Sequence, residues 1–294
     1  MKNSDGEYGL NLKSVLKLSE AKGEPEWMRD IRVEAWKAFE NSPMPDCIPE
    51  ADNLPFAHFR SFLPDPAKEQ KSWEALDAER ANEFSELRKT TKPVAGGVSA
   101  QLNSKIILHN IDENVSNLGV VYMSLDEAVQ DERYSELVRK YFMKLVKLDE
   151  HKFTALHTAF WSGGSFIYAP ANTKLDLDLQ AYCRFEEAGA GQFGHTIIVA
   201  EDGCNISFVE SCSAPKLGGH SIHAAIVEVF VGKNAKVRYS AIENWPDDVY
   251  NLNTKRAVIE DGGQLEFCTS MLNSGVNVGF PSVYLKGKNS SLNF

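Results

Sequence analysis

The sequence predicts a mainly β protein, with a β-helix-like solenoid over residues 153–294 behind a mixed α/β region over residues 1–152. Apolar residues recur with a helical period before Phe153 and alternate with a period of two after it, as expected for strands. The alternating half also repeats one template of strand, tight turn and strand about every thirty residues. That spacing is typical of a solenoid in which each repeat adds one coil.

The N-terminal region is predicted to contain three helical stretches. Apolar residues at helical spacing mark the first, Glu26–Glu40, which begins behind Pro25. The second, Pro66–Lys89, is strongly charged, which favours an exposed helix or one that lies against a partner. The third begins where Ser124 and Glu127 form a capping-box pattern. Two short strands are expected between the second and third stretches, at Lys105–His109 and Gly119–Met123.

The turns place the repeats along the C-terminal half. Their residues recur at intervals of 31, 29 and 26 and are Gly203, Asn234, Gly263 and Asn289. A sandwich of β-hairpins is the alternative arrangement of alternating strands. Its turns would recur about every 8–12 residues, so the longer interval favours the solenoid.

Aligning the repeats on their turns predicts which side chains share a face, because side chains alternate along a strand. The predicted core row consists of Ile206 and Phe208, Val237 and Tyr239, Leu265 and Phe267, and Leu292 and Phe294. The same parity carries Glu210, Cys212 and Glu243 toward the interior. Buried ionisable groups are costly unless they are paired or hydrated, so this row indicates a polar lumen. In the alternative, the strand bends after Phe208 and these groups reach solvent.

Composition and charge narrow the class of protein. Hydrophobic residues make up 43% of the chain and charged residues 24%, the proportions of a globular protein. No apolar run approaches the roughly 20 residues that span a bilayer. A net charge of −10 argues against nucleic acid or an anionic membrane as partner. The polar, acidic start at Met1–Tyr8 lacks the features of a secretory signal, so a cytoplasmic location is expected.

The cysteines are expected to be free thiols, because their number is odd and their spacing matches neither a CxxC pair nor a zinc site. They are Cys47, Cys183, Cys204, Cys212 and Cys268. Cys212 is the candidate nucleophile, because it lies at an accessible strand end before Pro215. Arg184 or Lys255 could stabilise its thiolate. The alternative is an inert cysteine that fills space.

Two further motifs are not interpreted as sites. Gly189–Gly194 matches the GxGxxG pattern, but strand-like residues follow it, so no helix N-terminus is available for a pyrophosphate. His220 and His223 are three residues apart, and we interpret them as a surface or core pair in preference to a metal site.

Several long segments, in order along the chain, resemble the SufB/SufD family of scaffold proteins of the SUF iron–sulfur cluster assembly system, and SufB more closely. They are Gly23-Glu-Pro-Glu-Trp-Met28, His109-Asn-Ile111, Trp161-Ser-Gly-Gly-Ser-Phe-Ile-Tyr-Ala-Pro170, Gly191-Gln-Phe193, Glu210-Ser-Cys-Ser-Ala-Pro215, Asn244-Trp245 and Tyr250-Asn-Leu-Asn-Thr-Lys-Arg-Ala257. The resemblance implies a right-handed parallel β-helix behind a helical region. It implies a scaffold, not an enzyme, which receives persulfide sulfur from a cysteine desulfurase. The implied sulfur acceptor is Cys212, and the implied sulfur path follows Arg184, Glu243, Trp245 and Lys255.

The resemblance also implies partners, namely a SufC-type ABC ATPase and SufD or a second SufB copy. It implies a nascent iron–sulfur cluster in the full assembly, with reduced flavin as a further candidate cofactor and none expected on this chain alone. The sequence departs from the family pattern at Glu243, where glutamine is usual, and at Gly194-His195, where the family often has Glu-Arg. The C-terminal coils and cluster-ligating region of SufB are absent, so we expect the β-helix to be incomplete at Phe294. A SufD-like structural partner and a β-helix enzyme acting on polysaccharides are the alternatives.

Overall fold

The computed structural model describes residues 9–46, 54, 56, 59–60, 70, 72–76, 78–84 and 94–294. Met1–Tyr8 and Cys47 lie outside these described residues. So does much of the predicted helix Pro66–Lys89, whose described parts are a short 3₁₀ helix η3 (Trp73–Ala75) and α3 (Ala78–Glu83). Within the described ranges, no helix combines the length and the apolar character that crossing a membrane would require.

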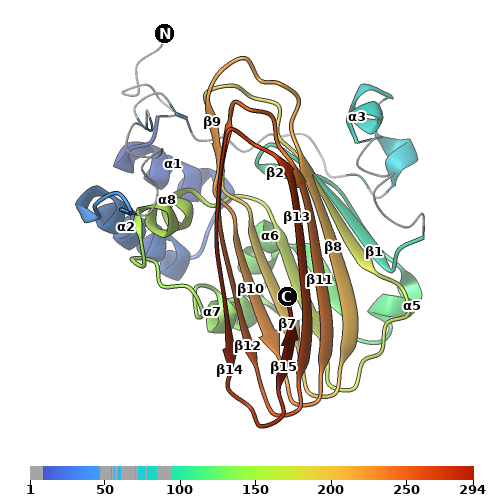
Figure 1. The fold of residues 1–294 in the computed structure, drawn as a ribbon. Coiled ribbons are helices and arrows are strands. Elements are labelled where there is room, and N and C mark those ends of the chain that lie inside the picture. The colour runs from blue at the N-terminus through green and yellow to red at the C-terminus, as the bar shows by residue number, and fades with distance from the viewer. Residues whose placement is uncertain are drawn as a thin grey trace.

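The strands form a parallel β-solenoid with two long sheets, and strands that precede α6, α7 and α8 in the chain begin both sheets (Figure 1). The first sheet, in spatial order, contains β2 (Lys105–Ile111), β1 (Gly97–Leu102), β5 (Leu179–Arg184), β8 (Asn205–Ser213), β11 (Lys236–Asn244), β13 (Gln264–Asn273) and β15 (Ser291–Asn293). The second contains β3 (Val121–Ser124), β4 (Ser165–Ala169), β7 (His195–Ala200), β10 (Ile226–Val231) and β12 (Val249–Ile259), with β14 (Val276–Leu285) beyond β12 and the short β9 (Ser221–His223) and β6 (Gly191–Gln192) beside it.

Each tight turn joins a strand of the second sheet to a strand of the first, so each repeat contributes one strand to each sheet. Successive coils pair in parallel, as β8 does with β5 and β11, and as β10 does with β7 and β12. Among the named strands, antiparallel pairs occur where the solenoid begins, between β1 and β2 and between β3 and β4. The solenoid prediction is therefore confirmed and the hairpin sandwich rejected.

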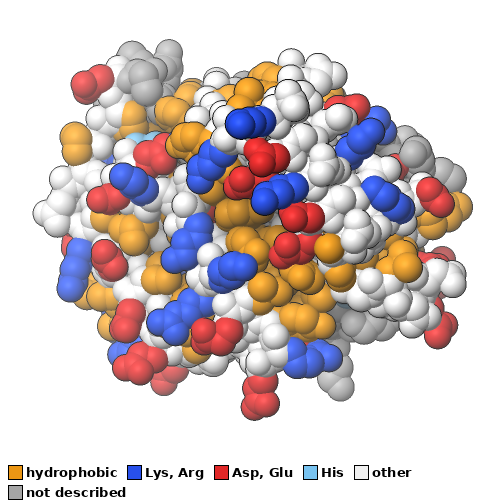
Figure 2. Space-filling model, turned by 90° about the horizontal axis from the view of Figure 1, so that it is seen from below, with side chains coloured by type: hydrophobic (Ala, Val, Ile, Leu, Met, Phe, Trp, Pro, Cys, Tyr) orange, Lys and Arg blue, Asp and Glu red, His pale blue; other side chains and the backbone are white. Residues whose placement is uncertain are grey.

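Stacked turns form one edge of the solenoid, at the bottom of Figure 1, and Figure 2 looks onto the molecule from that side, where acidic, basic and apolar side chains are interspersed. Gly203 and Asn234 have the left-handed backbone expected of turn residues, with φ values of 71° and 54°. In the next coil Gly262, with φ 65°, holds this position, so the predicted turn residue Gly263 is wrong by one. The Gly203 amide donates to the Lys233 carbonyl of the following turn at 2.7 Å, which ties one coil to the next.

The strand register confirms the predicted core row in the first three repeats, but its last member, Phe294, is 68% exposed, so that part of the prediction is wrong. Phe208 of β8 lies beside Tyr239 of β11, which lies beside Phe267 of β13. Their rings follow one another along the solenoid axis, with centroids 6.2 Å and 4.9 Å apart. All three side chains are buried, so the apolar half of each coil contributes to one continuous interior.

Helices cover the outer face of the second sheet, on one side of the solenoid in Figure 1. The main ones are α1 (Leu12–Lys22), α2 (Glu26–Asn41) and α8 (Lys152–Phe160), with α6 (Leu125–Gln130) and α7 (Ser135–Tyr141) nearby and a one-turn α5 (Glu113–Ser116) elsewhere. The helix predicted at Glu26–Glu40 is confirmed as α2. Ile197 and Val199 of β7 belong to the same buried cluster as these helices, which places that cluster on the outer face of the sheet.

Three details of the N-terminal prediction are wrong. The stretch that begins at Ser124 forms two helices, α6 and α7, instead of one. Ser124 precedes α6 without a side-chain cap, and the capping box lies instead between His151 and Thr154 at the start of α8. Because α8 extends to Phe160, the alternating pattern begins at Ser165 and not at Phe153.

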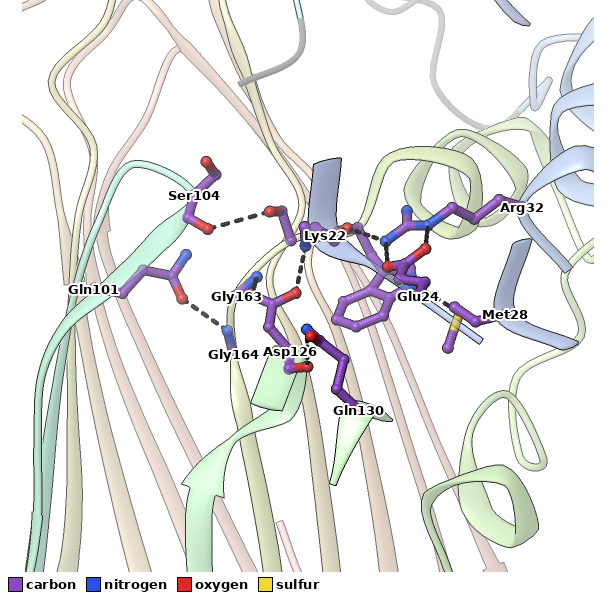
Figure 3. A network of polar contacts seen from close by, with 12 residues as sticks. Lys22, Glu24, Met28, Arg32, Gln101, Ser104, Asp126, Gln130, Gly163 and Gly164 are labelled. Carbon is purple, nitrogen blue, oxygen red and sulfur yellow. Dashed lines mark hydrogen bonds and ion pairs between the residues drawn. The ribbon is translucent and has the colours of Figure 1, made fainter. Parts of the chain in front are cut away.

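A buried network fixes the first helices to the solenoid (Figure 3). Arg32 is fully buried and donates to both carboxylate oxygens of Glu24, at 2.6 and 2.7 Å, and to the Trp161 carbonyl at 2.9 Å. Lys22 pairs with Asp126, which also accepts from the Gly163 amide at 2.8 Å. The Lys22 and Arg32 cations each lie 4.8 Å from the Trp161 ring. The Trp-Ser-Gly-Gly segment therefore joins the helices to the first coil.

Candidate functional site

A cluster of thiols and charged groups occupies the lumen between the two sheets. Parallel register places Cys183 of β5, Cys212 of β8 and Glu243 of β11 side by side on three successive strands. Lys255 of β12 reaches the same space from the opposite sheet. The prediction that Cys212 and Glu243 face inward is confirmed, because only 5% and 3% of these residues is exposed.

Glu243 is held as a carboxylate by four neighbours. Lys255 Nζ donates to Glu243 Oε1 at 2.7 Å, while the side-chain amides of Asn251 and Asn253 donate to Oε2 at 2.6 and 2.9 Å. Burial alone would raise the pKa of Glu243, but the Lys255 ammonium, its hydrogen bond, the charge of His223 and the Asn251 amide together hold it below its usual value. Lys255 therefore neutralises the charge of this acid.

The pKa of a second carboxyl group in the lumen, that of Glu210, is shifted in the opposite direction. Its Oε2 accepts a hydrogen bond from the Tyr239 hydroxyl at 2.9 Å. Burial raises the pKa of Glu210, and repulsion from Glu243 adds to this, against the attraction of Lys255 and the Tyr239 bond. The Lys255 ammonium therefore attracts two carboxyl groups, those of Glu243 and Glu210. Glu210 takes up a proton more readily than Glu243.

The Cys212 thiol is buried and is held in its neutral form. A hydrogen bond with Cys183, burial and the negative charges of Glu210 and Glu243 raise the pKa of Cys212 well above its usual value. The prediction of an accessible strand end is wrong, because β8 continues to Ser213 inside the sheet. Activation by a nearby cation is also limited, because the Lys255 ammonium is bonded to Glu243.

Aromatic and amide groups close the cluster on the far side of the thiols. Cys183 Sγ donates to Gln192 Oε1 at 3.3 Å, and His223 Nδ1 lies 3.0 Å from the same oxygen. The His223 ring packs on Trp245, with centroids 4.5 Å apart. Burial lowers the pKa of His223 to about 4, against the attraction of Glu243. A neutral imidazole therefore faces the thiols at neutral pH.

The structure brings four of the five candidate site residues into or against this cluster: Cys212, Glu243, Trp245 and Lys255. Arg184 is not among them. Its guanidinium bonds Glu186 at 2.9 Å and the Ser213 hydroxyl at 3.1 Å, and 19% of its side chain is exposed. Because Cys183 points into the lumen, its neighbour Arg184 points to the opposite face of the sheet.

Sequence reasoning missed four members of the cluster: Cys183, Gln192, Asn251 and Asn253. Asn251 and Asn253 share the strand parity of Lys255, so aligning β12 by parity would have identified them. Cys183 and Gln192 belong to the first coil, whose turn near Asn172 lies outside the four aligned repeats, so no register was available for them. A cavity of about 20 Å³, lined in part by Cys183, Cys212 and Lys255, adjoins the cluster and has room for one or two water molecules.

A separate buried chain of polar groups lies outside the lumen, beneath the helices. His157 Nε2 lies 3.0 Å from His195 Nδ1, and His195 Nε2 lies 3.1 Å from Glu228 Oε2. Glu228 also accepts from backbone amides of the loop after α7, at 2.6 Å for the Leu145 amide. Burial and the charge of His195 lower the pKa of His157 well below its usual value. This chain ties the helical layer to β7 and β10.

The described residues contain no group of three or more His, Cys, Asp or Glu side chains that could hold a metal ion. His220 and His223 agree with this, because His220 packs on Tyr250 while His223 points toward Gln192 and Trp245. The fold and site together define a parallel β-solenoid with a thiol-bearing, charged lumen.

Comparison with known proteins identifies the family. Residues 183–294 match the family described as "SUF system FeS cluster assembly, SufBD core domain", and residues 95–181 match "SufBD protein N-terminal region". An iron-sulfur cluster assembly SufBD family protein of Staphylococcus epidermidis is 37% identical over 284 residues. Proteins of the same description from Staphylococcus aureus and Staphylococcus haemolyticus match equally well. These alignments cover 96% of this chain and 61% of each relative. The chain belongs to the SufBD family.

Proposed function

We propose that this chain is a scaffold component of iron–sulfur cluster assembly that accepts persulfide sulfur on Cys212 and passes it through the lumen toward a nascent cluster. The observation that carries the proposal is the position of Cys212, which lies in the lumen beside Glu243 on the next strand. Membership of the SufBD family supports the assembly role. A buried, hydrogen-bonded thiol also suits a sulfane sulfur that must be kept from other thiols.

In this proposal the lumen groups have distinct roles. Lys255 offers the positive charge that a persulfide anion needs, once Glu243 or Glu210 takes up a proton. His223 and Trp245 pack together at the side of the cluster. Arg184 contributes through the end of β5, which it joins to Ser213 of β8, instead of through direct contact with sulfur.

The partners are proposed on the same basis. A cysteine desulfurase or a sulfur-transfer protein would donate the persulfide. A SufC-type ABC ATPase and SufD or a second SufB copy would complete the assembly, and reduced flavin is a candidate electron source. The cluster itself is cargo. The described residues contain no group of side chains that could ligate it, so its ligands would include other groups.

Persulfide labelling by a cysteine desulfurase tests the acceptor role. The wild-type chain should acquire desulfurase-derived sulfur on Cys212, and Cys212→Ser should lose it while keeping its fold. Cys204→Ser is the matched control, because Cys204 is a buried thiol in a turn, bonded to the Pro170 carbonyl at 2.8 Å and distant in register from the lumen cluster. Equal labelling of the wild-type and Cys212→Ser chains would reject Cys212 as acceptor.

A SufD-like structural partner, which supports a heterodimer and ATPase recruitment without accepting sulfur, is the second candidate. The raised pKa of Cys212 favours it, because a neutral, buried thiol is a poor nucleophile. Cluster assembly that proceeds at the wild-type rate with Cys212→Ser in place would support this candidate.

A further inference from the structure

Two thiols lie next to each other in the lumen. Cys183 and Cys212 are register partners on the adjacent parallel strands β5 and β8, and both are free and buried. Both belong to one buried cluster with Trp245, and both line the same cavity. The neighbouring Cys183 thiol is also the main cause of the raised pKa of Cys212. Cys183 is therefore the thiol best placed to react with any sulfur carried on Cys212.

The backbone spacing suits a bond between them. Neighbouring strands of a sheet lie about 4.8 Å apart, and disulfides form across Cα separations of roughly 4.4–6.8 Å. The two side chains leave their strands on the same face, because register partners in a parallel pair point the same way. The first coil therefore brings Cys183 within bonding reach of Cys212 without a change in strand pairing.

Polar neighbours fix the position of the Cys183 thiol in the lumen. Gln192 Oε1 accepts from Cys183 Sγ at 3.3 Å and also lies 3.0 Å from His223 Nδ1. A neutral His223 donates that second bond, so the amide oxygen is fixed as an acceptor. Gln192 itself is fully buried, and its position fixes the Cys183 side chain in the lumen.

We propose that Cys183 is a resolving thiol, which converts a persulfide on Cys212 into free sulfide. This rests on the proposed function, because it requires the persulfide. Cys183 Sγ attacks Cys212 Sγ, an S–S bond forms between the two cysteines, and the bond from Cys212 to the terminal sulfur breaks. The proton of Cys183 goes to the departing sulfur, so a thiol and a persulfide anion give a disulfide and hydrosulfide, HS⁻.

The proposed step reduces the transferred sulfur. Sulfur arrives at the oxidation level of a persulfide and leaves as sulfide, which is the form present in clusters, and the two cysteine sulfurs end as a disulfide. No external reductant is needed for one release. A dithiol reductant must then restore the Cys183 and Cys212 thiols before the next cycle.

Treatment of the 294-residue chain with inorganic polysulfide tests the step, because this probe is small enough for a buried site. The wild-type chain should release roughly one equivalent of sulfide and lose the mass of two hydrogens, with Cys183 and Cys212 joined in one peptide pair. Cys183→Ser should instead keep one extra sulfur atom on Cys212 and release sulfide roughly tenfold more slowly. Cys183→Ala serves as a second variant if serine disturbs folding, which circular dichroism would detect.

Cys268→Ser is the matched control, because Cys268 is exposed on β13 and should leave the Cys183–Cys212 product unchanged. A wild-type chain that keeps a Cys212 persulfide and forms no disulfide, while Cys183→Ser behaves in the same way, would overturn the resolving role and leave the acceptor role standing. A chain that takes no sulfur on Cys212 in either form would overturn both.

Discussion

Replacing Glu243 by glutamine removes one charge from the lumen while keeping the size of the side chain and an oxygen for Asn251 and Asn253. The change leaves the Lys255 ammonium, whose side chain is 6% exposed, without its partner at 2.7 Å. Removing one member of a buried ion pair costs about 3–5 kcal/mol. Because Glu210 also attracts Lys255, we expect the lower end, about 3 kcal/mol.

Equilibrium unfolding in urea, followed by tryptophan fluorescence at pH 7, measures this cost. Lys255→Met is the matched variant, because it leaves Glu243 as the unpaired charge. We expect the double variant to be more stable than the sum of the two single losses predicts, with a coupling of about 0.5–3 kcal/mol. Single variants that stay within about 0.5 kcal/mol of wild type, or strictly additive losses, would refute a stabilising pair.

The pH dependence gives the same pair a second readout. The pKa of Glu243 is lower in the folded chain than its usual value of 4.5. Its stabilising contribution is therefore present above about pH 4.5 and is lost as the pH falls through the folded pKa. Glu243→Gln should lose less stability in that acid range than wild type. An identical decline in both chains would contradict the assignment.

Three further predictions concern single side chains. Gly164→Ala should lower the free energy of unfolding by more than about 2 kcal/mol, because Gly164 has φ 94° and the new methyl group would meet the His195 carbonyl. Gly194→Ala is the control, because its methyl group meets nothing within 4 Å and the variant should unfold like wild type. His223→Gln should flatten the loss of stability between about pH 6.5 and 4 by up to about 3 kcal/mol, since the folded imidazole has a pKa of about 4 and stays neutral where the unfolded one is charged; an unchanged slope in urea unfolding would contradict this. Glu210→Gln should lower the pKa of Cys212, and iodoacetamide alkylation against pH should show the Cys212 profile moving to lower pH, whereas a fixed profile would remove Glu210 as a cause.

Much of the site followed from strand parity. Aligning repeats by their turns placed Cys212 and Glu243 on one inward row, and the register of β8 and β11 has them as direct partners. Cys183 was not assigned, because the aligned repeats begin at Gly203 and so do not include β5, whose pairing with β8 comes from the structure. Nor could parity predict the pKa of the Cys212 thiol, because that depends on burial and on groups from three strands.

The sequence by itself determined the period of the chain, its change from helices to strands, the length of each coil and the row of inward residues, because these follow from local alternation and from turn residues. Tertiary structure alone decided that Cys212 is buried beside Cys183, that Glu243 forms an ion pair with Lys255, and that Arg184 bonds Glu186 and Ser213 instead of the lumen groups. The physical reason is that burial and charge pairing depend on which coils and which opposite sheet meet. Those distances arise only when the solenoid closes around its lumen.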